Sequence, residues 1–340
     1  MFIKQIKIPE PEEIKAESPL PKELENLKKS RDKAVADVIT GKSDKLMVIV
    51  GPCSAHAEKP VLEYLEKLGK LNEKVKDKLV IVPRIYTNKP RTKGVGYKGM
   101  FSQPDPTKSE DILKGIKMIR EINIKAMEVS GLTAADEMLY PANYAYIDDL
   151  LTYVAVGARS SENQLHRLVS SGIDGAVGIK NPMSGSVMVL LNSIYAAQSG
   201  QTFKLNGWQV KTNGNPLSHA ILRGAVDGYG NDIPNFHYET VMQVIEGYAK
   251  SGLKNPAIII DANHSNSGKK FKQQIRICEE VMNNRLYDAD FKKYVKGFMI
   301  ESFLEEGNQS EDLVYGKSIT DPCLGWCDTE RLLLDVANKV

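Results

Sequence analysis

Eight short apolar runs in this 340-residue sequence are each followed by a side chain that can bind an anion or a metal ion. Four of these side chains are cationic, one is a thiol, one is an imidazole and two are carboxylates. In chain order, the residues are Cys53, Arg84, Glu128, Arg159, Lys180, Arg223, His264 and Glu301. This set suits a metal ion beside one or more phosphates, because cations bind phosphoryl oxygens and the other groups are metal ligands.

The apolar runs have the length of buried strands, and most are separated by stretches long enough for a helix. They lie at 47–50, 79–82, 126–127, 153–156, 176–179, 220–222, 258–260 and 298–300. Eight repeats of strand then helix predict an α/β fold, a (β/α)8 TIM barrel. In that fold the C-terminal ends of the strands surround one site, so the eight side chains should converge.

Part of this set predicts a metal site. Cys53, His264 and Glu301 follow the first, seventh and eighth runs, which are neighbours in a closed barrel, and Asp321 lies in a loop that can fold over the same mouth. One thiolate, one imidazole and two carboxylates can bind Mn²⁺, Fe²⁺, Co²⁺ or Zn²⁺, and the mixed donors leave the choice open. The alternative for each residue is a structural role, since a free cysteine is usually a small core residue.

A basic, glycine-containing loop at 83–99 predicts a phosphate site. It carries Lys89, Arg91 and Lys98 but no acidic residue, and its glycines let backbone amides approach a ligand closely. The cations that follow the fourth, fifth and sixth runs indicate the same kind of ligand, because uncompensated buried cations repel one another. The alternative is a solvated basic loop or a nucleic-acid patch.

Glu128 follows the third run and is expected inside the mouth among the cations. Two roles are open for it. It could pair with Arg159 or Lys180, or it could orient a water molecule for catalysis.

Two segments lie outside the repeat pattern. The first is an N-terminal arm (1–45), which precedes the catalytic barrel (46–340), and the second is an insertion within the barrel. In the arm, 2–8 alternates like a short edge strand, and Lys22–Ile39 has helical spacing. The arm could plug the barrel bottom, or it could make a subunit contact and regulate. Between the fifth and sixth strands, Asn206-Gly207 predicts a hairpin insertion that joins strands at 202–205 and 208–211.

The composition favours a soluble cytoplasmic enzyme. A hydrophobic content of 42% allows a large core, and a net charge of +2 argues against a general nucleic-acid binder. No apolar stretch approaches the ~20 residues of a membrane span, and the N-terminus has no signal-peptide core. Four cysteines in a chain of this size suggest a reducing compartment.

Several segments, taken in order, resemble the type I 3-deoxy-D-arabino-heptulosonate 7-phosphate (DAHP) synthases. The matching segments are Gly-Pro-Cys-Ser at 51–54, Lys-Pro-Arg-Thr at 89–92, Gly-Ala-Arg-Ser-Ser-Glu-Asn-Gln at 157–164, Gly-Asn-Pro and Ile-Leu-Arg-Gly within 214–224, His264 through Lys269, Ile-Glu-Ser and Glu-Gly-Asn-Gln within 300–309, and Ser-Ile-Thr-Asp at 318–321. The likeness runs from about residue 46 to the C-terminus. The combination is specific, although no single segment is.

The resemblance implies that phosphoenolpyruvate and D-erythrose 4-phosphate condense with water to give DAHP and phosphate, the first step of the shikimate pathway of aromatic amino acid biosynthesis. The implied metal ligands are Cys53, His264, Glu301 and Asp321. The implied phosphoenolpyruvate clamp is Arg84, Lys89, Arg159, Lys180 and Arg223. Arg91 and Thr92 would bind the phosphate of erythrose 4-phosphate, and Lys98 is a further substrate-binding candidate.

The resemblance also suggests catalytic roles and partners. The catalytic candidates are Lys89, Lys180, Glu128, His264 and Asp321, with Glu128 acting through a bound water and a lysine as proton donor. Relatives are commonly homodimers or homotetramers and can be inhibited by an aromatic amino acid. Asp174, and a hairpin shorter than in familiar bacterial members, put inhibition by phenylalanine or tyrosine in doubt.

Other functions fit part of the pattern. A sister barrel such as 3-deoxy-octulosonate 8-phosphate synthase is the nearest, although the Lys-Pro-Arg-Thr segment disfavours it. A non-catalytic phosphate or nucleic-acid binder could use the basic loop, and a Schiff-base aldolase could use Lys180.

Overall fold

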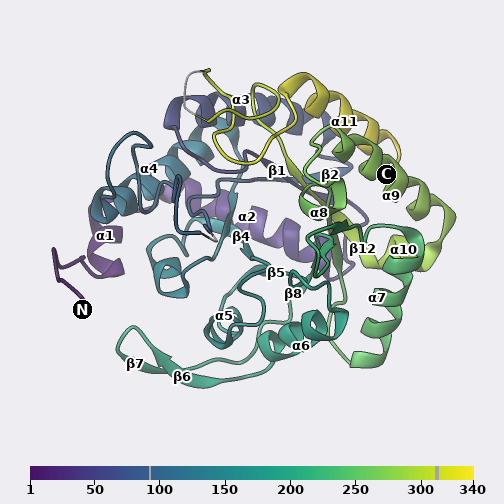
Figure 1. Ribbon diagram of the computed structural model, residues 1–340, viewed down its shortest axis with the longest axis horizontal. Helices are drawn as coiled ribbons and strands as arrows, with labels where there is room; N and C mark the ends of the chain where they lie inside the picture. Colours follow the sequence, from purple (N-terminus) through teal and green to yellow (C-terminus); the bar gives the residue numbers. More distant parts are fainter. Residues whose placement is uncertain (92, 311–313) are drawn as a thin grey trace.

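Eight parallel strands form the central sheet of the protein, seen in a computed structural model that describes residues 1–91, 93–310 and 314–340 (Figure 1). The strands are β1 (Leu46–Gly51), β2 (Leu79–Pro83), β3 (Ala134–Glu137), β4 (Leu151–Val156), β5 (Ala176–Lys180), β8 (Ser218–Leu222), β11 (Ile258–Asp261) and β12 (Val295–Glu301). Each pairs with its neighbours in chain order. A parallel bridge between Arg84 and Ala135 joins β2 to β3, which confirms the predicted TIM barrel.

The prediction for the third strand is wrong. Residues 126–127 lie inside a helix, α4 (Ile112–Ser130), which ends where Gly131 adopts a left-handed conformation. The true strand, β3, has the sequence Ala-Ala-Asp-Glu, which carries little apolar signal. Ala126 and Met127 are apolar because they lie on the buried face of α4, so a helical spacing was mistaken for a strand.

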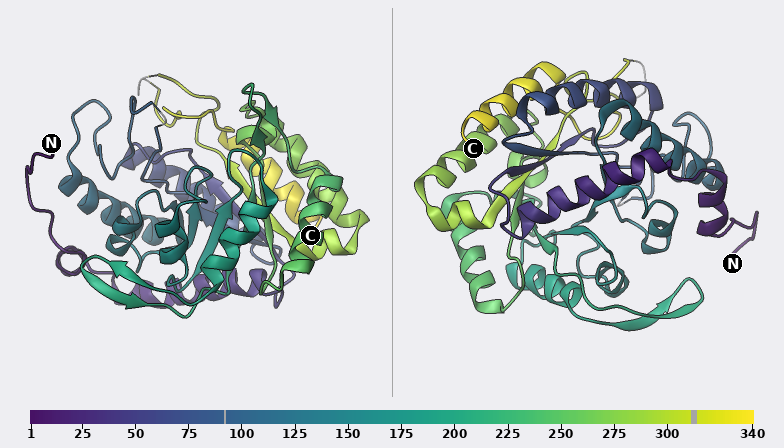
Figure 2. Two further views of the ribbon diagram at one scale, coloured as in Figure 1. Left: turned by 60° about the horizontal axis from the view of Figure 1, so that its bottom comes forward. Right: turned by 180° about the vertical axis from the view of Figure 1, so that it is seen from behind.

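The other helices and short strands surround the barrel (Figures 1 and 2). The helices are α3 (Glu58–Val75), η1 (Pro141–Tyr146), α5 (Gln164–Ser170), α6 (Val187–Gln198), α7 (Tyr238–Ser251), α8 (His264–Ser267), α9 (Gln273–Tyr287), α10 (Ala289–Tyr294) and α11 (Trp326–Asn338). One apolar cluster fills the space between strands and helices, and a second fills the barrel interior. Among the described residues, no helix is both long and apolar enough to cross a bilayer.

The N-terminal arm contains two helices, α1 (Pro11–Glu17) and α2 (Lys22–Ile39), and α2 matches the prediction. Figure 2 shows α2 crossing the barrel from behind. Its buried residues Val35, Val38 and Ile39 join the interior cluster, so α2 plugs the bottom of the barrel. The expected edge strand at 2–8 is absent, because this described segment is extended but pairs with no strand.

The predicted hairpin insertion is confirmed. β6 (Thr202–Leu205) and β7 (Trp208–Lys211) pair antiparallel outside the barrel. Asn206 and Gly207 both have positive φ, as a two-residue hairpin turn of this type requires. A second small hairpin, β9 (Ala225–Val226) with β10 (Asp232–Ile233), follows β8 and was not predicted.

Candidate active site

Three of the four predicted metal ligands form a cluster at the C-terminal rim of the barrel. Cys53 follows β1, Glu301 ends β12 and Asp321 lies in the loop before α11. Their ligand atoms all lie within 4.8 Å of one another, and Cys53 Sγ is 3.5 Å from Asp321 Oδ2. Two ligands of one ion are at most roughly 4.6 Å apart when each bond is about 2.3 Å. Small side-chain movements would therefore let all three contact one ion.

The fourth predicted ligand, His264, lies beside this cluster. Its Nε2 atom is 3.8 Å from Glu301 Oε1, and its Nδ1 atom is 2.8 Å from Oδ2 of buried Asp261. A carboxylate on one ring nitrogen fixes the ring and leaves the other nitrogen for a metal. The backbone of His264 has a φ of 50°, which non-glycine residues seldom adopt. The donor set and its supports fit a divalent metal ion.

A second layer of side chains holds Glu301. Asn263 Nδ2 donates to its Oε2 atom at 2.6 Å, and Arg84 Nη2 donates to its Oε1 atom at 3.0 Å. The side chain of Gln274 bonds both the backbone N–H and the carbonyl of Glu301. Sequence reasoning missed Asp261 and Asn263. Asp261 could have been found, because it is itself the last residue of a strand.

The electrostatics of the cluster favour a bound cation. Burial opposes ionisation of Glu301, but His264 and Arg84 outweigh it and hold the pKa of this carboxyl below its usual range. Burial also opposes ionisation of Asp321, but Lys89 and other nearby cations lower its pKa. By contrast, burial and the charge of Glu301 raise the pKa of the Cys53 thiol to about 11. A coordinated divalent ion would ionise this thiol, since coordinating thiols lose their proton.

The strand-end cations lie at the same rim. Arg84, Lys180 and Arg223 are only 1%, 4% and 6% exposed. Lys180 Nζ is 2.9 Å from Asp261 Oδ2, and Arg223 Nη1 donates to Ser265 Oγ at 2.9 Å. Burial lowers the pKa of Arg223. Arg84 and Lys180 have carboxylate partners in Glu301 and Asp261, whereas the bond from Arg223 to Ser265 is to a neutral group, so an anionic ligand would offset the lost hydration of Arg223.

Two strand-end arginines, Arg84 and Arg159, have guanidinium groups that could bind a ligand. Within the described part of the chain, the buried Nη1 atom of Arg84 has no hydrogen-bond partner. The Arg84 guanidinium stacks 3.9 Å from the centre of the Tyr86 ring, which fixes its orientation. Arg159 follows β4 and is exposed, and its charge acts on Arg223. These unused donors are typical of a site that binds a phosphate or carboxylate group.

The basic loop brings one of its cations to the metal cluster. Lys89 Nζ lies 2.6 Å from Cys53 Sγ and 3.7 Å from Asp321 Oδ2. Arg91 Nε donates to the Tyr97 carbonyl at 2.7 Å, which leaves its terminal nitrogens for a ligand. Thr92 lies outside the described residues.

Lys98 is not brought to the cluster. Its ammonium group is partly exposed and pairs with Glu110, on the loop that leads to α4. A lysine in a glycine-rich loop can point either way, and the loop sequence alone gave no means of deciding.

The expectation that Glu128 lies in the mouth is wrong, because it is exposed on α4. The carboxylate at the real strand end is Glu137, the last residue of β3. Its Oε1 atom occupies the space that a Cβ on Gly157 would fill, at the end of β4. Glu137 was missed because β3 itself was missed.

Comparison with known proteins identifies the family. The sequence model of the DAHP synthetase I family matches residues 15–334. The chain belongs to this family. Within it, the chain is 41% identical over 318 residues to the "Phospho-2-dehydro-3-deoxyheptonate aldolase, Phe-sensitive" of Escherichia coli K12, covering 91% of this chain and 87% of that one. It is 39% identical over 340 residues to the Trp-sensitive protein of Enterobacter agglomerans, covering 97% and 94%.

A solved structure of the same family agrees with the fold. The phospho-2-dehydro-3-deoxyheptonate aldolase of Francisella tularensis SCHU S4 superposes with a TM-score of 0.92 at 32% identity, covering 100% of this chain and 98% of that chain. The relatives include proteins named Phe-, Trp- and Tyr-sensitive, so the aromatic amino acid named differs among these relatives.

Proposed function

We propose that the protein condenses phosphoenolpyruvate with D-erythrose 4-phosphate and water to give DAHP and phosphate. The observation that carries this proposal is one shared rim, where a thiol–carboxylate cluster lies beside deeply buried cations. A metal site alone or a phosphate site alone would suit many enzymes. Here Lys89 of the basic loop contacts Cys53 and Asp321 of the cluster, so the proposed phosphate and metal sites adjoin. Adjoining sites of these two kinds suit a reaction that joins a phosphorylated enol to an aldehyde.

Phosphoenolpyruvate would be held by the buried cations. Arg84 Nη1 and the donors of Arg223 would bind its phosphate and carboxylate, and Lys180, kept in place by Asp261, would add a third charge. Arg159, which is exposed, would add a fourth positive charge. Fixing the anionic groups orients C3 of phosphoenolpyruvate toward the second substrate, so that much of the entropy cost of reaction is met on binding.

Erythrose 4-phosphate would lie between the basic loop and the metal cluster. Arg91 and Thr92 would bind its phosphate, with Lys89 and Asp321 near its hydroxyls. When bound by Cys53, His264, Glu301 and Asp321, a divalent ion supplies Lewis-acid polarisation of the aldehyde oxygen. The new carbon–carbon bond joins C3 of phosphoenolpyruvate to the aldehyde carbon, water adds at C2, and phosphate leaves.

The addition of water at C2 needs a proton acceptor. We infer that Glu137 has this role, because it is the carboxylate at the end of the third barrel strand, where Glu128 was expected. Lys180 and Lys89 remain the proposed proton donors. Lys180 lies beside Asp261, and Lys89 lies beside Cys53, so both amino groups are at the rim where the substrates would bind.

The direct test follows the loss of phosphoenolpyruvate with erythrose 4-phosphate after Mn²⁺ is added. Turnover that a chelator abolishes and Mn²⁺ restores is expected. No turnover, or turnover insensitive to chelator, would reject the proposal. Arabinose 5-phosphate is assayed in parallel, and a preference for it would instead establish the sister octulosonate-forming reaction.

Inhibition by an aromatic amino acid is proposed for a groove beneath the hairpin. The groove is lined by Tyr144 and Phe203, with Asp148, Asp174 and Lys211 at its edges. Aromatic rings and opposite charges suit a zwitterion with an aromatic side chain. An inhibition panel with phenylalanine, tyrosine and tryptophan tests this. Inhibition that Asp174→Ala leaves unchanged would place the inhibitor elsewhere.

A homo-oligomer and a cytoplasmic location complete the proposal. Phe2, Ile3 and Ile6 on the arm and Trp208 on the hairpin are large apolar side chains left exposed, which is typical of a subunit contact. The four cysteines are free, which suits a reducing compartment. Light scattering on the full chain and on a chain lacking residues 1–8 tests the oligomer, and an unchanged mass would remove the arm from the interface.

A further inference from the structure

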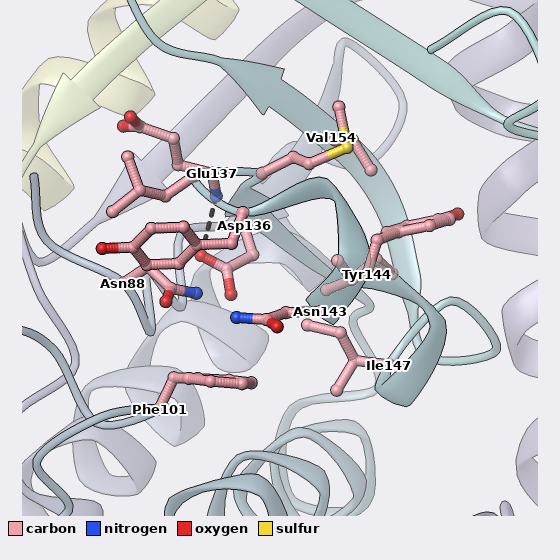
Figure 3. Close-up of a pocket in the computed structure, with 12 residues that line it drawn as sticks. Asn88, Phe101, Asp136, Glu137, Asn143, Tyr144, Ile147 and Val154 are labelled. Atoms are coloured by element: carbon pink, nitrogen blue, oxygen red, sulfur yellow. Dashed lines mark hydrogen bonds between the residues drawn. The ribbon is translucent and has the colours of Figure 1, made fainter. Parts of the chain in front are cut away.

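Asp136 lies behind the active site, in a small pocket between β3, η1 and the start of the basic loop (Figure 3). In β3, Ala135 belongs to the barrel interior and Ala134 to the outer core, so Asp136 faces outward by alternation. It is 2% exposed. We propose that Asp136 is a positioning residue that holds the basic loop in register, so that Lys89 and Arg91 meet the sugar phosphate.

The contacts of Asp136 converge on one residue of the loop. Thr87 N donates to Asp136 Oδ1 at 2.9 Å, and the Thr87 hydroxyl donates to Asp136 Oδ2. The backbone N–H of Glu137 also donates to Oδ1, at 2.7 Å (dashed in Figure 3). One carboxylate therefore joins the first turn of the basic loop to the end of β3.

The loop transmits this constraint to Lys89 over two residues. Thr87 is held on its other side, because its carbonyl accepts from Phe101 N at 3.0 Å. Gly99 packs so closely on Thr87 and Asn88 that a Cβ at Gly99 would overlap the Thr87 carbonyl. Lys89 N then donates to the Lys98 carbonyl at 3.1 Å. The backbone from Thr87 to Lys89 is thus held between Asp136 on one side and residues 98–101 on the other.

A carboxylate is a costly choice for this place. In the part of the chain that the structure describes, no cationic side chain lies within 4.0 Å of Asp136, and the groups of Thr87 and Glu137 that donate to it are neutral. Burial, the largest effect, raises the pKa of Asp136 to about 7. A residue that only filled space could be apolar and avoid this cost. The two carboxylate oxygens together accept three hydrogen bonds, which an apolar side chain could not do.

The pocket around Asp136 supports a polar rather than a packing role. Its carboxylate points into the pocket between the side chains of Asn88 and Asn143 (Figure 3). Asn88 Oδ1 is buried and has no hydrogen-bond partner among the described residues. Asn88 Nδ2 donates to the Thr87 hydroxyl at 3.3 Å, and that hydroxyl donates to Asp136, so hydrogen bonds connect Asp136 to the residue that precedes Lys89.

The test measures steady-state kinetics of the metal-loaded enzyme, and it rests on the proposed roles of Lys89 and Arg91. We expect Asp136→Ala to raise the KM for erythrose 4-phosphate at least tenfold. The KM for phosphoenolpyruvate should change less than threefold, because Lys89 is only one of its proposed contacts, and Arg84, Lys180 and Arg223 do not depend on Asp136. Asp136→Asn can keep all three bonds if the Thr87 hydroxyl reverses, so it should restore the KM to within about threefold of the wild type.

The control is Asp288→Ala. Asp288 accepts from Phe291 N at 2.8 Å and from the Tyr238 hydroxyl at 2.9 Å, far along the chain from the basic loop. This variant loses comparable bonds and should lower the melting temperature without changing either KM. If Asp136→Ala changes both KM values equally, or neither, the positioning role is rejected.

Two further measurements keep the proposal testable. Should Asp136→Ala fail to fold, Thr87→Val removes one of the same bonds, and an unchanged KM for erythrose 4-phosphate in that variant rejects the proposal. Amide hydrogen exchange of the peptide spanning 86–91 should quicken in Asp136→Ala or Thr87→Val but not in Asp288→Ala. This readout needs no turnover, so an inactive wild type would reject the proposed function and leave the clamp to be judged by exchange alone.

Discussion

Asp261 Oδ2 lies 2.8 Å from His264 Nδ1, and the same oxygen atom lies 2.9 Å from Lys180 Nζ. One buried carboxylate therefore supports both halves of the site, the metal side through His264 and the anion side through Lys180. Burial opposes its ionisation, but His264 and Lys180 hold the pKa of Asp261 well below its usual range. The carboxylate is thus charged, and it offsets part of the positive charge that would otherwise gather at the rim.

Replacing Asp261 with asparagine should weaken both halves together. We expect Asp261→Asn to reduce metal affinity about 10- to 100-fold, as is usual when the partner of a metal-bound histidine is removed. The KM for phosphoenolpyruvate should also rise, because Lys180 loses its support. A chelator competition assay measures the metal affinity. Asp328→Asn is the control, because Asp328 on α11 pairs with exposed Arg331, and equal effects in the two variants would contradict the prediction.

Cys53→Ala should nearly abolish activity and leave the fold intact. The thiol is a small group in a polar cluster, so its loss removes a metal donor without opening a large cavity. Circular dichroism, metal content and turnover are measured side by side. Cys327→Ala, which changes an exposed thiol, should behave as the wild type. Retained metal binding and turnover in Cys53→Ala would remove this residue from the ligands.

Arg91→Ala should raise the KM for erythrose 4-phosphate more than that for phosphoenolpyruvate. Loss of a charge-assisted bond to phosphate costs about 1.5–3 kcal/mol, which is roughly 10- to 100-fold in binding. Lys98→Ala is the matched control from the same loop, because its ammonium group pairs with Glu110 instead of facing the cluster. Steady-state kinetics with each substrate varied in turn decide the matter, and equal effects on both substrates are incompatible with the assignment.

Substitutions of Glu137 and Glu128 test which of the two glutamates is the proton acceptor. Glu137→Gln should lower kcat by roughly 10²- to 10⁴-fold, the usual contribution of a proton acceptor, with little effect on either KM. Glu128→Gln, on the outer face of α4, should leave kcat unchanged. If the two variants have the same kcat, Glu137 is not the acceptor.

His219 should make stability depend on pH. The Tyr153 hydroxyl bonds its Nε2 atom at 2.8 Å inside the barrel, and burial lowers the pKa of His219 to about 4. Between pH 4 and about 6.5 the unfolded chain binds this proton and the folded chain does not, so stability rises with pH across this window. His219→Gln should flatten this part of the melting-temperature profile. Exposed His237→Gln should not, and a profile that the two changes alter equally would refute the assignment.

The sequence predicted most of the barrel because seven of its strands contain a short apolar run, as is typical of strands buried on both faces. β3 was not predicted, because Ala-Ala-Asp-Glu has little intrinsic strand propensity and is held in the sheet by its neighbouring strands. The expectation that side chains at strand ends converge on one rim agrees with the positions of Cys53, Glu301 and the buried cations. It failed at Glu128, where the strand itself was misplaced.

Residues that act through other residues were harder to predict. Asn263 and Asp136 are connected to the site through hydrogen bonds with Glu301 and Thr87, which lie 38 and 49 positions away in the sequence. No spacing rule connects such pairs, because the contact depends on how two strand ends meet in the closed barrel. Lys98 shows the opposite case, a residue with the right charge and neighbours whose side chain turns outward to Glu110.

The position of α2 changes how the chain must be divided. Val35, Val38 and Ile39 belong to the same interior cluster as Met47 and other strand residues. A fragment that began at residue 46 would therefore leave the lower end of this cluster open to water. The boundary near residue 45 separates two parts of the sequence but not two cooperative folding units, and arm and barrel should melt in a single transition.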